Sequence, residues 1–140
     1  MHERSSFDYA VLRVVPRVER GEFLNAGLIM LCLTRNFLSA RVHFEEPLLL
    51  SICPDLDTDT VKRHLEAFPR ICSGEPDAGP IALLPNRQKF HWLVAPRSTI
   101  VQVSPVHCGL CESPAEMFES LFARLVTRVV PPAVPRNTTI

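Results

Sequence analysis

Apolar residues dominate three stretches near the start of the chain. Residues 7–15 are apolar at almost every position except Asp8 and Arg13, a pattern typical of a strand covered on both faces. Residues 23–33 form a second apolar run, and a glycine within it favours a strand over a helix. In residues 37–44 apolar and polar side chains alternate, which predicts a strand with one buried face. The short connections between these stretches indicate an antiparallel meander of three strands.

Helical spacing marks a later segment. Val61, Leu65 and Phe68 recur at the interval that places them on one face of a helix. The acidic residues within 55–59 precede them, where they suit the positive end of the helix dipole. We expect Pro69 to end this helix or to follow it directly.

The clearest helix start lies at Ser113. Ser113 is a capping residue, Pro114 suits the first helical position, and Glu116 completes a capping box. The apolar stripe that follows consists of Met117, Phe118, Leu121, Phe122, Leu125 and Val126. We expect this second helix to end before the two prolines that begin at residue 131.

Other segments are less regular. Residues 48–52 indicate a short turn or helix, and the composition of residues 73–80 is that of a loop. Residues 90–94 fit a helical turn or a strand, and we expect Trp92 within them to belong to the core. Residues 100–103, bounded by prolines, are the better strand candidate.

These elements predict an α+β fold: an antiparallel sheet, made of the three-strand meander and at least one later strand, with two main helices packed on it. We expect the helix that starts at Ser113 to cover the apolar face of the meander and the other helix to flank it. The length of 140 residues suits one core, so residues 1–130 are expected to form a single compact domain. Residues 131–140, rich in proline, are predicted to be a disordered tail.

Charge and cysteine usage narrow the function classes. The 15 Lys and Arg residues balance the 15 Asp and Glu residues, so no whole-molecule field attracts nucleic acid or an anionic membrane. No apolar stretch reaches the roughly 18 residues of a membrane span, and the first residues lack the apolar core of a signal peptide. The five cysteines, an odd number, suit reduced thiols. We therefore expect a cytoplasmic protein that binds neither nucleic acid nor a membrane.

Basic residues gather first around the end of the first strand. Arg13 stands among apolar neighbours, so its guanidinium must reach solvent or a carboxylate. Arg17 and Arg20 follow in the next loop, where acidic residues alternate with them. One interpretation is a solvated loop with local ion pairs of little energetic value. The other is a rim that recognises an anion.

A second basic segment spans residues 78–111, which contain no acidic residue. Within it, Arg97 follows a proline and precedes Ser98, a combination that can bind phosphate or carboxylate. Acidic residues instead gather in residues 45–59, so the two oppositely charged segments could also simply attract one another.

Neither metal nor catalytic motifs are complete. Residues 55–66 resemble a calcium loop, but Thr60 stands where that loop needs glycine, and helix capping explains the same acids. Cys108 and Cys111 are half of a zinc or redox site without a second pair. His107 could act as an acid or base, yet no triad partner has suitable spacing. We predict no metal and no cofactor.

Three longer strings resemble one family. They are FDYAVLRVVPRVERGEFLNAG at residues 7–27, APRSTIVQ at residues 95–102 and SPVHCGL at residues 104–110. Over about residues 6–127 the chain resembles the bacterial family catalogued as domain of unknown function 3037. That resemblance implies no established activity, and it implies small stand-alone proteins, some encoded beside HipA-like kinase proteins, which suggests a protein partner.

The strings coincide with the two basic segments. We therefore predict one anion-recognising cleft at one end of the sheet, formed by Arg13, Arg17, Arg20, Asn25, Arg97 and Ser98, with His107 close by. The favoured function is a noncatalytic regulatory or adaptor module that grips a phosphorylated or acidic group of a protein partner. The alternative is an enzyme of phosphate-ester or nucleotide chemistry, with His107 as acid–base residue and Arg97 as clamp.

Overall fold

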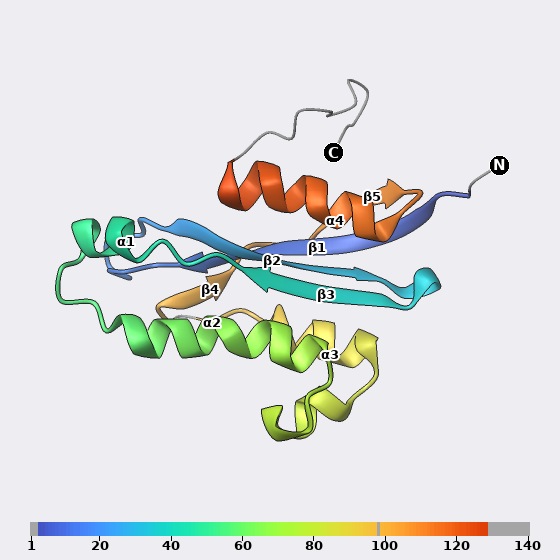
Figure 1. Ribbon diagram of the computed structural model, residues 1–140, viewed down its shortest axis with the longest axis horizontal. Helices are drawn as coiled ribbons and strands as arrows, with labels where there is room; N and C mark the ends of the chain where they lie inside the picture. Colours follow the sequence, from blue (N-terminus) through green and yellow to red (C-terminus); the bar gives the residue numbers. More distant parts are fainter. Residues whose placement is uncertain (1–2, 98, 129–140) are drawn as a thin grey trace.

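A computed structural model describes residues 3–97 and 99–128 of the chain. Five antiparallel strands form one sheet in the order β3-β2-β1-β4, and β5 also pairs with β1 (Figure 1). The strands are β1 (Ser5–Val14), β2 (Leu24–Cys32), β3 (Phe37–Val42), β4 (Val101–Val103) and β5 (His107–Cys111). The predicted α+β fold, with its meander and later strand, is confirmed.

The meander is closely packed along β2. Its register with β1 shifts after the pair Leu12–Gly27, so that Arg13 lies opposite Asn25. A Cβ atom on Gly27 would lie 2.8 Å from the carbonyl oxygen of Arg41 and 2.9 Å from Leu12 Cδ1. Glycine is therefore required where β3 and β1 approach β2 from both sides.

Two short strands share the outer edge of β1. β4 pairs with Leu12–Val14, and β5 pairs with Ser5–Tyr9. Between them the buried Ser104 supplies the hydrogen bonds that a paired strand would otherwise make to Val11. Its Oγ accepts the amide hydrogen of Val11, and its own amide donates to the Val11 carbonyl, both at 2.9 Å. β1 is thus hydrogen-bonded on this edge beyond the limits of the two strands.

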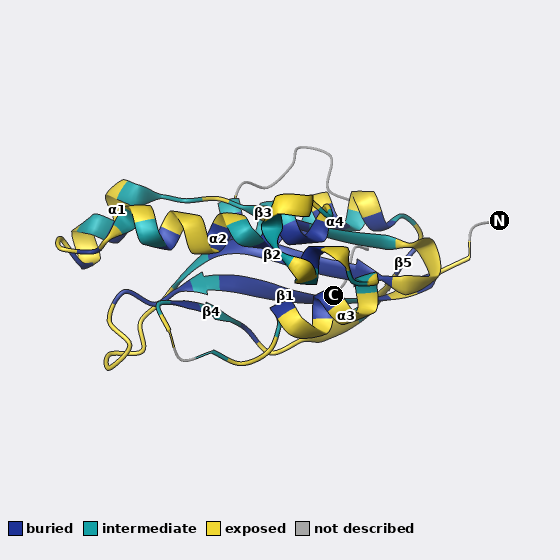
Figure 2. Ribbon diagram, turned by 90° about the horizontal axis from the view of Figure 1, so that it is seen from below, coloured by how far each residue is buried: buried dark blue, intermediate teal, exposed yellow. Residues whose placement is uncertain are grey.

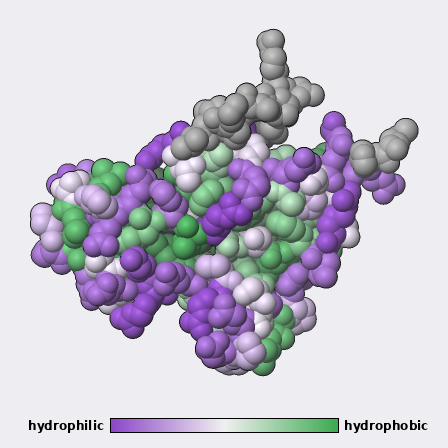
Figure 3. Space-filling model, viewed as in Figure 1, coloured by the Kyte–Doolittle hydropathy of each residue, from purple (hydrophilic) through white to green (hydrophobic). Residues whose placement is uncertain are grey.

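Helices cover both faces of the sheet (Figures 1 and 2). α2 (Thr58–Cys72) and α3 (Asn86–Leu93) pack on one face, while α4 (Pro114–Phe122) packs on the other and continues as a π-helical turn (Ala123–Thr127). The short α1 (Glu46–Ile52) joins β3 to α2. The outward face of α2 is hydrophilic (Figure 3), as expected for an amphipathic helix.

The predicted placement of the two main helices is wrong in detail. The apolar face of β3, with Leu38 and Ala40, packs against the α2 and α3 side. α4 covers the other face, where Arg41 of β3 lies 5.1 Å from the ring centroids of both Phe118 and Phe122. Because β1 and β2 are apolar on both faces, one helical layer could not bury them.

Helix ends follow the predicted caps, with one exception. Ser113 Oγ accepts the amide hydrogen of Glu116, and an Asp57 oxygen accepts that of Thr60. Pro69, however, lies inside α2, which continues to Cys72. A proline in the last turn removes only one backbone hydrogen bond, so the helix tolerates it.

The structure also bears on the expectations for residues 90–94, for a membrane span and for the tail. The ambiguous residues 90–94 lie mostly in α3, and Trp92 is 48% exposed rather than part of the core. Among the described residues, no helix combines the length and apolar character needed to cross a bilayer. The predicted tail, residues 131–140, lies outside the described residues.

Candidate functional site

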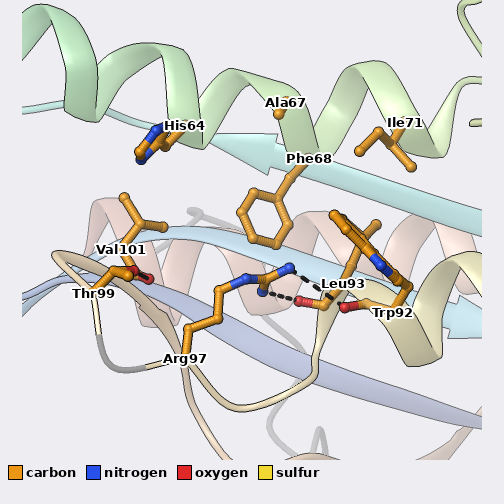
Figure 4. Close-up of a pocket in the computed structure, with 9 residues that line it drawn as sticks. All are labelled: His64, Ala67, Phe68, Ile71, Trp92, Leu93, Arg97, Thr99 and Val101. Carbon is orange, nitrogen blue, oxygen red and sulfur yellow. Dashed lines mark hydrogen bonds between the residues drawn. The ribbon is translucent and has the colours of Figure 1, made fainter. Parts of the chain in front are cut away.

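Arg97 folds back onto the helix that precedes it. Its Nη1 donates to the carbonyl of Leu93, and its Nη2 donates to that of Trp92 at 3.4 Å (Figure 4). Both carbonyls belong to the last turn of α3, where backbone acceptors lack partners within the helix. The positive charge also suits the negative end of the helix dipole. α3 therefore holds the guanidinium in a defined position.

The same guanidinium lies between two aromatic rings. Its Cζ is 5.4 Å from the ring centroid of Phe68 on α2 and 5.4 Å from that of Trp92. Burial lowers the pKa of Arg97, but an arginine remains charged at neutral pH. No carboxylate among the described residues forms an ion pair with it. A half-buried positive charge is thus left without a counter-ion in this part of the chain.

A pocket of about 290 Å³ opens beside this charge, between α2, α3 and the segment leading to β4 (Figure 4). Its lining is mostly apolar and consists of His64, Ala67, Phe68, Ile71, Trp92, Leu93, Arg97, Thr99 and Val101. The hydroxyl of Thr99 donates to the Val101 carbonyl at 2.8 Å, which leaves its oxygen free to accept. An apolar group that ends in an anion matches these walls.

A second, wide-open hollow also borders Trp92. It is lined by Arg87, Gln88, His91 and Trp92, all from α3. None of these side chains is acidic, as expected from the absence of acids in residues 78–111. Trp92 therefore lines both hollows, and each hollow also has an arginine in its lining.

Arg13 lies on the opposite face of the sheet from Arg97. Its neighbours Leu12 and Val14 belong to the core under α2 and α3, so Arg13 points to the α4 side. Its Cζ lies 4.1 Å from the ring centroid of Phe23, and its register partner is Asn25. Of the predicted site residues, these two are brought together.

The loop arginines have local acidic partners. Arg20 donates to both carboxylate oxygens of Glu22, at 2.8 and 3.1 Å, which lowers the pKa of Glu22. Arg17 Nη2 lies 3.8 Å from Asp55 Oδ1, within the acidic segment. For these two arginines the interpretation as solvated ion pairs is the one that fits.

His107 lies neither in the Arg97 pocket nor beside Arg13 and Asn25. It lies on β5 with its ring centroid 5.4 Å from that of Tyr9. Tyr9 precedes Arg13 by four residues of an extended strand, or about 13 Å. Ser98 lies outside the described residues. The prediction of a single cleft is therefore wrong, because alternation along β1 sends Arg13 to one face while Arg97 lies with α3 under the other.

Cys108 and Cys111 form no paired site. Cys108 is exposed and Cys111 buried, since residues three apart in a strand point to opposite faces. All five cysteines are free thiols. The residues that the structure describes contain no group of three or more side chains able to hold a metal ion.

Several pocket residues were not predicted as site residues. Phe68 reads as core from its helical spacing, and His64 has no distinguishing neighbour in the sequence. Trp92 could have been found, because it stands in the acid-free segment that also contains Arg97. The sequence alone does not show that the Trp92 side chain is exposed rather than buried in the core.

Comparison with known proteins identifies a family. A family model described as "Protein of unknown function (DUF3037)" matches residues 9–126. No curated protein and no solved structure matches the chain. The matched range contains Arg13, Arg17, Arg20 and the whole pocket around Arg97.

Proposed function

We propose that this chain, which belongs to the DUF3037 family, acts as a noncatalytic regulatory or adaptor module that binds an acidic group of a protein partner. The pocket between α2 and α3 is the proposed binding site. The observation that carries the proposal is the Arg97 guanidinium, held between Phe68 and Trp92 with no carboxylate partner among the described residues.

Electrostatics and shape support this choice of ligand. A partly desolvated cation gains more from an anion than an exposed one, because the surrounding dielectric is lower. The apolar walls add affinity for a hydrocarbon or aromatic body. A volume of about 290 Å³ lies at the lower limit of ligand pockets and suits a side chain or a small acid.

The hydrogen bonding of Arg97 favours a carboxylate over a phosphate. Two of its nitrogens already donate to the Leu93 and Trp92 carbonyls. A phosphate group is best bound by several donors, whereas a carboxylate needs fewer. We therefore propose an acidic residue of the partner, accompanied by an apolar one, as the bound group.

The proposed setting is the cytoplasm, where free thiols persist. A HipA-like kinase protein is the first protein partner to test. The enzyme alternative gains no support, because His107 and Arg97 do not border one site.

The single tryptophan of the chain gives a direct assay, since Trp92 lines the pocket. We would titrate the protein with phenylpropionate and with phenylpropanol, its uncharged analogue, and record Trp92 fluorescence. The proposal expects the acid to bind at least about tenfold more tightly than the alcohol, a difference of about 1.4 kcal/mol.

Variants separate the charge from the apolar walls. Arg97→Met keeps an apolar stem and should abolish the preference for the acid while leaving weak binding of the alcohol. Arg63→Ala removes an exposed arginine of α2 that only bonds Thr60, and should change nothing. Equal affinity for acid and alcohol in the unmodified protein would refute the proposal.

A further inference from the structure

The open hollow on α3 adjoins the Arg97 pocket through a shared side chain. Trp92 belongs to the lining of both, and the Cζ atom of Arg97 lies 5.4 Å from the centroid of its ring. The other residues that line the open hollow, Arg87, Gln88 and His91, are all exposed. A molecule that extends from the Arg97 pocket past Trp92 therefore meets a second basic surface.

Neither hollow has an acid in its lining that could neutralise its arginine. Within the described residues, Arg87 and Arg97 form no ion pair, whereas Arg70 of α2 has two acidic partners. Residues 78–111 contain no Asp or Glu, so α3 itself offers none. Both charges are thus available to an anion from outside the chain, and such complementarity favours a specific partner.

The two arginines belong to opposite ends of α3. Arg87 is the second residue of the helix, whereas the guanidinium of Arg97 bonds the carbonyls of Trp92 and Leu93 in its last turn (Figure 4). With a rise of about 1.5 Å per residue, the backbones of Arg87 and Leu93 are about 9 Å apart along the helix axis.

A peptide in the polyproline II conformation has a matching repeat. It advances about 3.1 Å per residue and completes a turn in about three residues, so side chains three residues apart point the same way at a spacing of about 9 Å. Segments of this kind bind grooves lined by aromatic side chains. Trp92, which is 48% exposed, offers such a side chain between the two arginines.

We propose that the two hollows together bind an extended acidic segment of a protein partner, with two acidic residues three positions apart. One carboxylate pairs with Arg97 and the other with Arg87. The residues between them pack on Trp92, and the amide of Gln88 is able to bond the peptide backbone. This mode of binding rests on the proposed function, because the Arg97 pocket makes the first contact. The second acid and its spacing are additional.

A peptide fits these walls better than a nucleic acid or a membrane surface does. Binding to either of those depends on many basic contacts, because each neutralised phosphate or lipid headgroup adds a share of the affinity. Here two arginines flank one tryptophan, in a chain whose 15 basic residues are balanced by 15 acidic ones. The mostly apolar Arg97 pocket instead accommodates the stem of an acidic side chain.

Capped peptides without tryptophan test the spacing, with Trp92 fluorescence as the readout. We would compare Gly-Glu-Pro-Leu-Glu-Gly with two peptides that keep one acid, Gly-Glu-Pro-Leu-Gln-Gly and Gly-Gln-Pro-Leu-Glu-Gly. The diacid should bind at least about fivefold more tightly than either, whereas two equivalent acids that use one site alone give roughly twofold. Gly-Glu-Glu-Pro-Leu-Gly, with adjacent acids, should not exceed that twofold gain, because its carboxylates point in different directions.

Variants assign the second contact to Arg87. Arg87→Gln should reduce the affinity for the diacid to that of the single-acid peptides, while phenylpropionate, which reaches only the Arg97 pocket, should bind within about twofold of its original affinity. Arg63→Gln removes an exposed arginine of α2 outside both linings and should change neither affinity. Because Arg87 is exposed, its replacement should leave the fold intact. An unchanged affinity for the diacid in Arg87→Gln would overturn the second contact.

The results separate this mode of binding from the proposed function. If phenylpropionate binds but the diacid gains nothing over the single-acid peptides, the second contact is refuted and the Arg97 pocket stands. If neither phenylpropionate nor any peptide binds, the proposed function is refuted and the second contact with it. Oligouridylate or phosphatidylserine vesicles that bind more tightly than the diacid, and more weakly to Arg87→Gln, would overturn the choice of a peptide.

Discussion

Arginines in this protein differ by what surrounds the guanidinium rather than by their place in the sequence. Arg20 is exposed and bonded to Glu22 two residues away. Arg97 is half-buried, bonded to two helix carbonyls and placed between two rings. The first arrangement contributes little to stability because water screens it. The second both fixes the end of α3 and leaves a charge beside a pocket.

Replacing Arg97 should therefore affect stability as well as binding. Arg97→Met removes two hydrogen bonds to carbonyls and two cation–π contacts, and we expect the free energy of unfolding to fall by about 1–2 kcal/mol. Urea denaturation measures this change. Arg63→Ala on the outer face of α2 should stay within about 0.5 kcal/mol of the unmodified protein. An equal effect of both substitutions would show that the contacts of Arg97 are not stabilising.

At the scale of the elements, the two helical layers are attached by different means. α2 and α3 are held mainly by apolar packing on Leu12, Ile29 and their neighbours. α4 is also attached by polar contacts. Arg41 of β3 donates to both carboxylate oxygens of Glu119, and its guanidinium lies over the rings of Phe118 and Phe122.

This attachment should depend on pH. The hydrogen bond from Arg41 lowers the pKa of Glu119 below its value in the unfolded chain. The unfolded chain therefore takes up the proton first as pH falls, so the stabilisation is present above the unfolded pKa and is lost through the lower folded pKa. Because Glu119 is largely exposed, screening limits the contribution to less than about 1 kcal/mol.

Glu119→Gln tests the linkage. The variant should be slightly less stable than the unmodified protein at pH 7, and the difference should vanish as the pH falls through the lowered pKa of Glu119 and the carboxyl is protonated. Thermal unfolding across this range measures it, with Glu116→Gln on the same helix as a comparison. A difference that persists undiminished in acid would assign the effect to packing instead.

The elements also show which parts of the fold a sequence can reveal. β1, β2 and α4 were predictable because apolar runs and a capping box are local signals. β5 was missed: His107, Cys108 and Leu110 are exposed, so this edge strand carries no apolar alternation. Its pairing with β1 depends on Phe7 packing against Gly109, more than 100 residues away in the chain.

The candidate site was harder to predict for a related reason. The sequence shows that residues 78–111 contain no acidic residue, but whether an arginine has an acidic partner depends on the folded chain. Arg17 meets Asp55 only after the chain has passed through β2, β3 and α1. Arg13 and Arg97 are separated by the thickness of the sheet, which their sequence patterns do not encode.

At the scale of the whole molecule, burial controls the chemistry of the thiols. Four of the five cysteines are buried, and burial raises the pKa of Cys72 to about 12. Only the thiolate is reactive, so these four should be inert in the native state. Cys108 is exposed on β5.

We expect one thiol to react rapidly with a disulfide reagent such as dithionitrobenzoate in the native protein, and all five to react after denaturation. Cys108→Ser should remove the rapid phase, while Cys72→Ser should leave it intact. Two or more rapid thiols in the native protein would show that the core opens more readily than its packing implies.

The hydrogen bonds between Ser104 and Val11 restrict the order in which the protein can unfold. Because its side chain and backbone bond Val11 between the attachments of β4 and β5, β1 has partners along almost its whole length on that edge, and β2 covers the other. Exposing the centre of β1 requires both neighbours to leave at once. Partial opening therefore begins at the periphery, and the first strand of the chain is the last to be released.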